Sequence, residues 1–133
     1  MIEEKRDFYI DGQWVKPFQI NDLEVIDPST EEVCAIISLG SKNDTDDAVK
    51  AAKNSFESWW GTSKEKKIEL LNNLLEIYIR RASEMAEAIS KEMGAPKDWS
   101  RNQQSQSGED HIKTFINNYI KFKFENFLNE EEG

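Results

Sequence analysis

The strongest pattern along the chain is helical and covers Thr62–Met93. Apolar residues recur there at alternating steps of three and four, which places them on one face of a helix. They are Ile68, Leu71, Leu75, Tyr78, Ala82, Met85 and Ile89. Thr62 and Glu65 have the spacing of a capping box at the start, and Gly94 is a typical stop signal. A helix this long is unusual in a small domain, so we expect a break within Arg80–Ser83.

Ahead of this helix, aromatic and β-branched residues predict two hairpins. Phe8–Val15 contains Asp11-Gly12 between such residues, which is the strongest short signal for a type I′ turn. A second hairpin is expected from Leu23–Ile26 and Val33–Leu39, joined by the turn Asp27-Pro28-Ser29-Thr30. The last of these strands is apolar at nearly every position, which favours cover on both faces. Two hairpins cannot provide that cover, so the strand requires more protein than the chain contains.

A helix is also predicted between the hairpins and the long helix. It begins at Ser41, where Asp44 completes a capping box, and ends at Gly61. Trp59 and Trp60 could form a platform for a ligand, but at a helix end we expect them to pack in the core. The buried stripe of this helix is expected to be Val49, Ala52, Phe56 and Trp59.

A last helical stretch follows Pro96 and is expected to reach about Phe127. Gly108 interrupts it, at a cost of about 1 kcal/mol relative to alanine. Its apolar side consists of Ile112, Phe115, Ile116, Tyr119 and Ile120. The chain is therefore predicted to be α+β, with N-terminal β-hairpins over residues 1–42 followed by three helical segments over residues 43–127.

Composition and charge narrow the classes of function. The net charge is −9, from 26 acidic and 17 basic side chains, and neither the hairpin region nor the helical region is basic. Binding to nucleic acid or to an anionic membrane surface is therefore not expected. The single cysteine excludes an internal disulfide and suits a reducing compartment. With no signal-peptide pattern and no long apolar run, we expect a cytoplasmic protein.

Four short motifs, in this order and at this spacing, resemble the N-terminus of the NAD(P)-dependent aldehyde dehydrogenase superfamily. They are Tyr9-Ile10-Asp11-Gly12-x-Trp14, Ile26-Asp27-Pro28-Ser29-Thr30-x-Glu32, Ala48-Val49-x-Ala51-Ala52 with Trp59, and Glu92-Met93-Gly94-x-Pro96. The resemblance covers about residues 8–123. Two departures bear on the subfamily: Ala95 stands where many members have lysine, and Lys66-Lys67 where an arginine is usual.

The resemblance implies that residues 1–133 are an incomplete N-terminal part of a Rossmann-like nucleotide-binding domain. Members of this family are several times longer, and their catalytic cysteine, general-base glutamate, oxyanion asparagine and Gly-rich cofactor turn lie in later sequence. We therefore expect an N-terminal fragment of an enzyme that oxidises aldehydes to carboxylic acids with NAD or NADP. By itself it is expected to bind no cofactor and to be inactive, its partner being the rest of the parent chain.

The same resemblance implies two sites. Many members hold a monovalent cation, here between the carbonyl oxygens of Val25 and Ile26 and the side chain of Glu92. The alternative is that Glu92 is a solvated residue at a helix end. The last helix borders the substrate entrance in the family, so Gly108, His111 and Ile112 would line it; the alternative is a partly exposed helix histidine.

Other reactive or charged side chains are expected to be structural. Cys34 lies in the apolar strand after two glutamates, where a thiolate is disfavoured, so we expect a buried cysteine rather than a nucleophile. The cluster Lys64, Lys66 and Lys67 alternates with glutamates and is expected to be a solvated face.

A different class of function also fits the sequence, namely a stand-alone helical interaction or structural module without catalysis. In either case, exposed apolar faces and unpaired strand edges are expected to cause self-association of the isolated chain.

Overall fold

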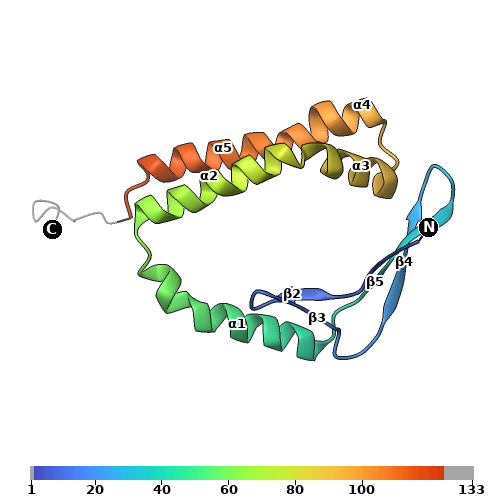
Figure 1. Cartoon of the computed structure of the whole chain (residues 1–133), viewed down its shortest axis with the longest axis horizontal. Coiled ribbons are helices and arrows are strands. Elements are labelled where there is room, and N and C mark those ends of the chain that lie inside the picture. The colour runs from blue at the N-terminus through green and yellow to red at the C-terminus, as the bar shows by residue number, and fades with distance from the viewer. Residues whose placement is uncertain (1, 125–133) are drawn as a thin grey trace, which may run out of the picture.

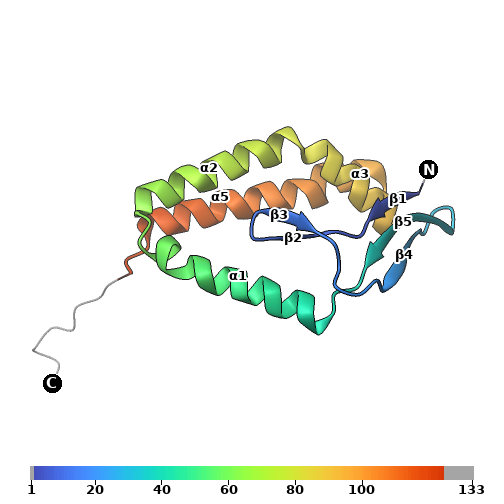
Figure 2. The same ribbon diagram turned by 60° about the horizontal axis from the view of Figure 1, so that its bottom comes forward.

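The computed structural model describes residues 2–124, and a three-stranded sheet lies at one end of it (Figure 1). Strands β4 (Asp22–Asp27) and β5 (Glu32–Ser38) form the predicted second hairpin. An additional strand, β1 (Glu3–Lys5), pairs in parallel with β5, so that β5 is central in the order β1-β5-β4. The helices extend from this sheet in two arms, as Figure 2 shows. One arm is α1 (Lys42–Trp60), and the other consists of α2 (Lys64–Arg80), α3 (Ala82–Met93) and α5 (Gln106–Lys121).

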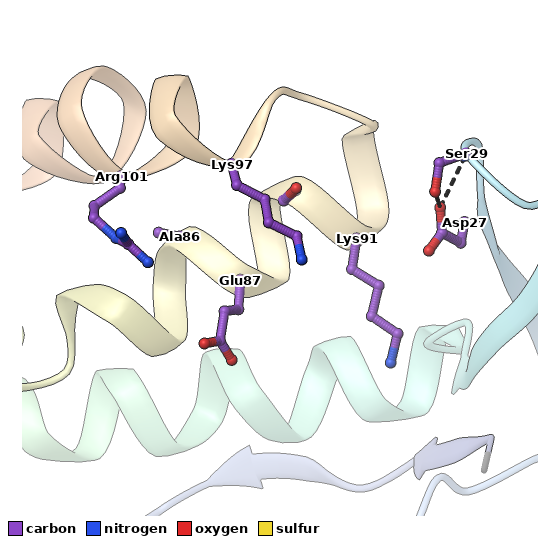
Figure 3. A pocket seen from close by; sticks show the side chains of 8 residues that line it. Asp27, Ser29, Ala86, Glu87, Lys91, Lys97 and Arg101 are labelled. Carbon is purple, nitrogen blue, oxygen red and sulfur yellow. Dashed lines mark hydrogen bonds between the residues drawn. The ribbon is translucent and has the colours of Figure 1, made fainter.

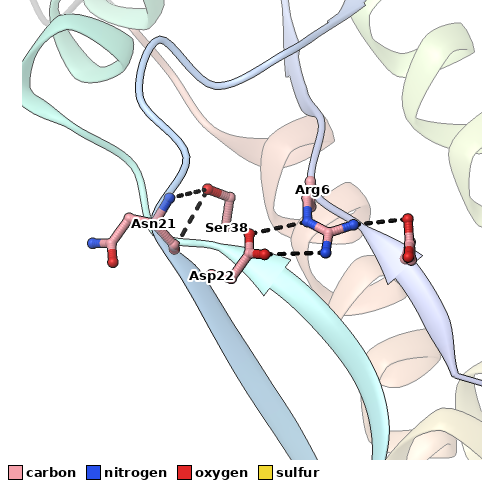
Figure 4. A network of polar contacts seen from close by, with 5 residues as sticks. Arg6, Asn21, Asp22 and Ser38 are labelled. Atoms are coloured by element: carbon pink, nitrogen blue, oxygen red, sulfur yellow. Dashed lines mark hydrogen bonds and ion pairs between the residues drawn. The ribbon is translucent and has the colours of Figure 1, made fainter.

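A charged network attaches β1 to the hairpin (Figure 4). The Arg6 guanidinium donates two hydrogen bonds to the Asp22 carboxylate, at 2.9 and 3.0 Å, and forms an ion pair with Glu4 at 2.8 Å. The fork geometry of arginine suits such a bidentate bond. Beside it, the Asn21 backbone N–H donates to the Ser38 hydroxyl at 3.3 Å. These side chains fix the approach of the chain to the edge of the sheet.

The first hairpin is confirmed with its predicted turn. Strands β2 (Phe8–Ile10) and β3 (Gln13–Val15) are antiparallel, and Asp11 and Gly12 have φ angles of 52° and 75°. Positive φ at both central positions is what a type I′ turn requires.

The β4–β5 turn is also confirmed, and a β-bulge follows it. The Asp27 carboxylate accepts hydrogen bonds from the Ser29 backbone N–H at 2.8 Å and from its hydroxyl, and these bonds lower the pKa of Asp27. The register shifts between Val25 and Ile26, which leaves Cys34 as the extra residue on β5. Cys34 is 8% exposed, so its predicted burial is confirmed.

Helix α1 (Lys42–Trp60) begins with the predicted capping box. Asp44 accepts hydrogen bonds from the Ser41 backbone N–H at 2.7 Å, from the Ser41 hydroxyl at 2.6 Å and from the Phe18 backbone N–H at 2.8 Å. The hydroxyl of Ser41 has the largest effect on the pKa of Asp44, which lies below its ordinary value. This carboxylate therefore joins the start of α1 to the loop after β3.

Part of the loss of stability below about pH 4 is expected to come from protonation of Asp44. Because its pKa is lower in the folded chain than the value of about 3.9 in an unfolded chain, its stabilising effect is complete above that value and is lost as the pH falls through the folded pKa. In urea titrations across this range, the midpoint of Asp44→Asn should fall less steeply than that of the wild type. Asp47→Asn, which removes an exposed carboxylate from the same helix, is the control and should retain the wild-type slope.

The predicted burial of the α1 stripe is wrong for residues 2–124. Val49, Phe56 and Trp59 are 52%, 62% and 52% exposed, Ala52 is exposed as well, and Trp60 is 70% exposed rather than packed in a core. The reason is that only the small hairpin strand β2 packs substantially against α1 among the described elements. Phe56 and Trp60 instead stack on each other, with ring centroids 6.2 Å apart.

The long helical pattern forms two helices, α2 (Lys64–Arg80) and α3 (Ala82–Met93), so the predicted break is confirmed at Arg81. The predicted capping box at Thr62 is wrong: Ser63 is the N-cap, and its hydroxyl accepts from the backbone N–H of Lys66 at 3.2 Å. Gly94 ends α3 with a φ of 72°, as the stop signal predicted.

The last helical stretch has three parts. A short helix α4 (Lys97–Trp99) leads into a π-helical segment, η1 (Ser100–Ser105), and then into α5 (Gln106–Lys121). The helix ends at Lys121, before the predicted limit of Phe127, which lies outside the described residues. Gly108 does not interrupt α5; a Cβ atom at this position would be 2.2 Å from the Tyr78 hydroxyl of α2. The glycine thus allows close packing of α5 on α2.

Lys64 has a structural role that its prediction as part of a solvated face missed. Its Nζ donates to the backbone carbonyls of Ile120 and Phe122, at 2.9 and 3.0 Å, at the end of α5. A cation suits the negative end of a helix dipole. Lys64 therefore ties the start of α2 to the end of α5, whereas Lys66 pairs with Glu69 on the surface as expected.

Candidate functional site

Two of the sequence motifs meet where the end of α3 packs against the β4–β5 turn. A Cβ atom on Gly94 would lie 2.7 Å from Pro28 Cγ, so this glycine is in close contact with the turn. Helix α3 and strand β4 are in contact as well. The fold thereby brings together the strand before Asp27-Pro28 and the helix end before Gly94, which carry the three residues of the predicted cation site.

The surroundings of these three residues are partly open. Val25 is half-buried, Ile26 is 43% exposed, and both flank the register shift in the β4–β5 ladder. Bulges of this kind re-aim backbone groups and are frequent beside functional sites. The Glu92 side chain is exposed and forms no hydrogen bond or ion pair within residues 2–124. The described part of the chain holds no cluster of three acidic, histidine or cysteine side chains that could bind a metal, so any cation site there must use backbone carbonyls as well.

An open cleft of about 490 Å³ lies beside this junction, between α3, the α4–η1 segment and the β4–β5 turn (Figure 3). Lys91 donates to Glu3 at 3.2 Å, and this bond raises the pKa of Lys91. Lys97 and Arg101 have no acidic partner among residues 2–124. The lining residues are Asp27, Ser29, Ala86, Glu87, Ser90, Lys91, Lys97 and Arg101.

With the Glu3 carboxylate that pairs with Lys91, three carboxylates balance the three cationic side chains of the cleft, so its charge does not favour a ligand of either sign. Lys97 and Arg101 were not among the residues predicted from the sequence. They are four residues apart in the helical stretch that follows Pro96, a spacing that places both on one helical face and could have identified them.

The residues predicted to line a substrate entrance share consecutive turns of α5 but have different surroundings. Gly108 is half-buried and faces Tyr78 of α2, Ile112 is half-buried, and His111 is exposed. The exposed His111 agrees with the simpler interpretation of a surface histidine and leaves its imidazole accessible. Tyr78, which sequence analysis placed on the apolar face of the long helix, is the residue that connects this part of α5 to α2.

Comparisons with known proteins agree with the resemblance found in the sequence. The model of the aldehyde dehydrogenase family matches residues 14–132. A crystal structure of aldehyde dehydrogenase from Bartonella henselae is 49% identical with a TM-score of 0.93, and the match covers 96% of this chain and 27% of that one. A variant of aldehyde dehydrogenase C from Pseudomonas syringae, in complex with NAD+ and octanal, is 35% identical with a TM-score of 0.90, over 93% of this chain and 26% of that one.

A curated relative, a 3-succinoylsemialdehyde-pyridine dehydrogenase from a Pseudomonas species, is 44% identical over 95 residues, which are 71% of this chain and 20% of that protein. The chain thus spans about a quarter of the length of the relatives it matches. Among the helices of residues 2–124, none has the length and apolar character needed to cross a bilayer. The α+β arrangement is part of the aldehyde dehydrogenase fold, and the chain belongs to the aldehyde dehydrogenase family.

Proposed function

We propose that this chain forms the N-terminal part of the nucleotide-binding domain in an enzyme that oxidises aldehydes to carboxylic acids with NAD or NADP. The observation that carries the proposal is the match to the Bartonella henselae structure, which extends over nearly all of this chain and about a quarter of that one. The likeness to the Pseudomonas syringae enzyme, solved with NAD+ and octanal, supports this class of cofactor and substrate.

Within such an enzyme, this chain supplies scaffold rather than reacting groups. The remaining three-quarters of the protein would contribute the nucleophile, the general base and the cofactor turn, and NAD or NADP, when bound there, would accept the hydride. Cys34 is buried in a strand and so is poorly placed to act as a nucleophile. We therefore infer that the isolated chain does not catalyse.

A chimaera tests this proposal. This chain replaces the matching quarter of the Pseudomonas syringae enzyme, with the catalytic cysteine of that enzyme intact, and octanal-dependent NAD+ reduction is followed by the absorbance of NADH. We expect activity from the chimaera and none from the isolated chain. The matched control carries the corresponding quarter of the Bartonella henselae enzyme. Turnover by the isolated chain, or an inactive chimaera beside an active control, would refute the proposal.

We also propose that Val25, Ile26 and Glu92 bind a monovalent cation in the complete enzyme. The contact between α3 and β4, together with the bulge between Val25 and Ile26, supports this assignment. In crystals of the chimaera soaked with thallium(I), we expect an anomalous peak between the two carbonyl oxygens and the Glu92 carboxylate. Anomalous peaks elsewhere in the crystal would show that thallium had entered. If there were such peaks but none between these three groups, the proposal would be refuted.

Gly108, His111 and Ile112 are proposed to border the substrate entrance. The exposure of His111 and the half-burial of Ile112 support it, since both side chains are available to a part of the protein that packs on α5. In the chimaera, His111→Ala should change the KM for aldehydes and leave the KM for NAD+ unchanged. Identical aldehyde KM values would argue against this role.

The isolated chain is expected to self-associate. Large apolar side chains are exposed on α1, on the first hairpin and on the loop that follows it, and large exposed apolar patches favour association. They include Phe56, Trp60, Tyr9, Trp14, Phe18 and Ile20. Sedimentation velocity over a range of concentrations should show a growing fraction of dimer or larger species. A sedimentation coefficient that fits a 15.4 kDa monomer at every concentration would contradict this expectation.

A further inference from the structure

The π-helical segment η1 is held in place by a buried polar contact with the break between α2 and α3. Ser100 and Ser105, at the two ends of η1, are 0% and 1% exposed and are the most deeply buried side chains of the described residues. The Ser105 hydroxyl donates to the backbone carbonyl of Ala82 at 2.9 Å, at the first residue of α3. A π-helical turn inside a longer helix is uncommon and is frequent at functional sites.

Tyr78 reaches the same point from α2. Its hydroxyl donates to the backbone carbonyl of Ser105 at 2.8 Å, where the π-helical turn gives way to α5. Gly108, one turn further on, makes room for the tyrosine ring, since a Cβ atom there would be 2.2 Å from the hydroxyl oxygen. Three residues from three elements thus define one contact, and each depends on the others for its geometry.

The rotation of α5 about its axis depends on the π-helical turn that precedes it. A π-helical turn contains about one residue more than an α-helical turn, so its relaxation to α-helix would rotate the following residues by roughly 100°. Such a rotation would move His111 and Ile112 to a different side of the helix. The hydroxyl of Tyr78 stabilises the carbonyl at the end of the π-helical turn, and so opposes the relaxation.

We propose that Tyr78 and Ser105 are positioning residues that fix the rotation of α5 and thereby place His111 and Ile112 at the substrate entrance. The inference rests on the proposed function, because the entrance exists only in the complete enzyme. Neither residue touches the substrate; both act through α5.

The test compares Tyr78→Phe and Ser105→Ala with Tyr119→Phe, all in the active chimaera. Tyr119 lies on α5 and its hydroxyl forms no hydrogen bond within residues 2–124, so it controls for the loss of a tyrosine hydroxyl. For Tyr78→Phe and Ser105→Ala we expect the KM for octanal to rise about tenfold, with kcat changed less than about twofold, since misplacement of a lining group affects binding first. The KM for NAD+ should stay the same.

Amide hydrogen exchange in the 133-residue chain tests the positioning of α5 separately from its link to the substrate entrance. In Tyr78→Phe, amides of residues 106–112 should exchange about tenfold faster, and in Tyr119→Phe they should not. Unchanged exchange would overturn the positioning of α5. Faster exchange with unchanged octanal KM would show a purely structural contact and overturn the link to the entrance. An inactive wild-type chimaera beside an active Bartonella henselae control would instead refute the proposed function, and the exchange result would still decide the positioning.

Discussion

Replacement of Gly94 by alanine should lower the free energy of unfolding by about 3 kcal/mol, because two costs add at this position. Gly94 has a φ of 72°, a left-handed conformation that costs an alanine about 1–2 kcal/mol. The new Cβ atom would also be 2.7 Å from Pro28 Cγ, so the β4–β5 turn must move away from the end of α3. Urea titration of the chain at one fixed concentration, followed by tryptophan fluorescence, measures the change.

Gly12→Ala is the matched control for Gly94→Ala. Gly12 has a similar φ of 75°, but a Cβ atom there would meet nothing within 4 Å, so only the backbone cost of about 1–2 kcal/mol is expected. The double variant Pro28→Ala, Gly94→Ala should lose less stability than the sum of the two single variants. Equal losses for Gly12→Ala and Gly94→Ala would show that the contact with Pro28 is unimportant.

Gly108→Ala should destabilise the chain by about 2 kcal/mol, although alanine is the better helix former by about 1 kcal/mol. Steric overlap decides the sign, because the new Cβ atom would be 2.2 Å from the Tyr78 hydroxyl oxygen and 2.6 Å from Cζ. The Tyr78 hydroxyl also donates a hydrogen bond to the backbone carbonyl of Ser105, so movement of the ring would break this hydrogen bond as well. The same urea titration applies.

Gly61→Ala controls for the replacement of a glycine that has a helical φ angle but no steric overlap. Gly61 has a φ of −70°, and a Cβ atom there would be 3.5 Å from the Glu57 carbonyl oxygen, an ordinary contact. We expect this variant to stay within about 0.5 kcal/mol of the wild type. A stabilising Gly108→Ala would mean that the Tyr78 ring moves aside at little cost, and would remove the steric argument.

Local features of the fold were predictable from the sequence because their causes lie within a few residues. Asp11-Gly12 specifies its turn through positive φ angles, Asp44 caps the start of α1, and Gly94 ends α3. The misplaced cap of α2 has the same kind of cause. Thr62 and Ser63 are adjacent hydroxyl residues that can each serve as N-cap, and the pattern alone does not rank them.

Features that depend on distant residues were not predictable in this way. The pairing of Glu3–Lys5 with β5, the role of Lys64 at the end of α5 and the fit of Tyr78 over Gly108 each join residues far apart in sequence. For the apolar stripe on α1, the helix was predicted correctly but its burial was not. Its helical period correctly predicted the element, but burial requires a neighbour, and β2 is the strand or helix of the described residues that packs most against α1.

The candidate site was predictable only at the level of motifs. Their order located the strand before Asp27-Pro28 and the helix before Gly94, and packing of Gly94 on Pro28 brings the two together. The cleft beside them, with Lys97 and Arg101, depends on how α4 and η1 lie against α3. No local rule specifies that arrangement.

The parallel pairing of β1 with β5 has a consequence for synthesis of the protein. Glu3 pairs with Ala35, so the first strand leaves the ribosome well before its partner does. At about 5–20 residues per second, the delay is on the order of a few seconds. During that time the first hairpin can form by itself, whereas β1 must wait. Neither β1 nor β4 can pair before β5 has emerged, but a short turn joins β4 to β5 whereas a much longer segment separates β1 from β5. We therefore expect the β4–β5 hairpin to close before β1 joins the sheet.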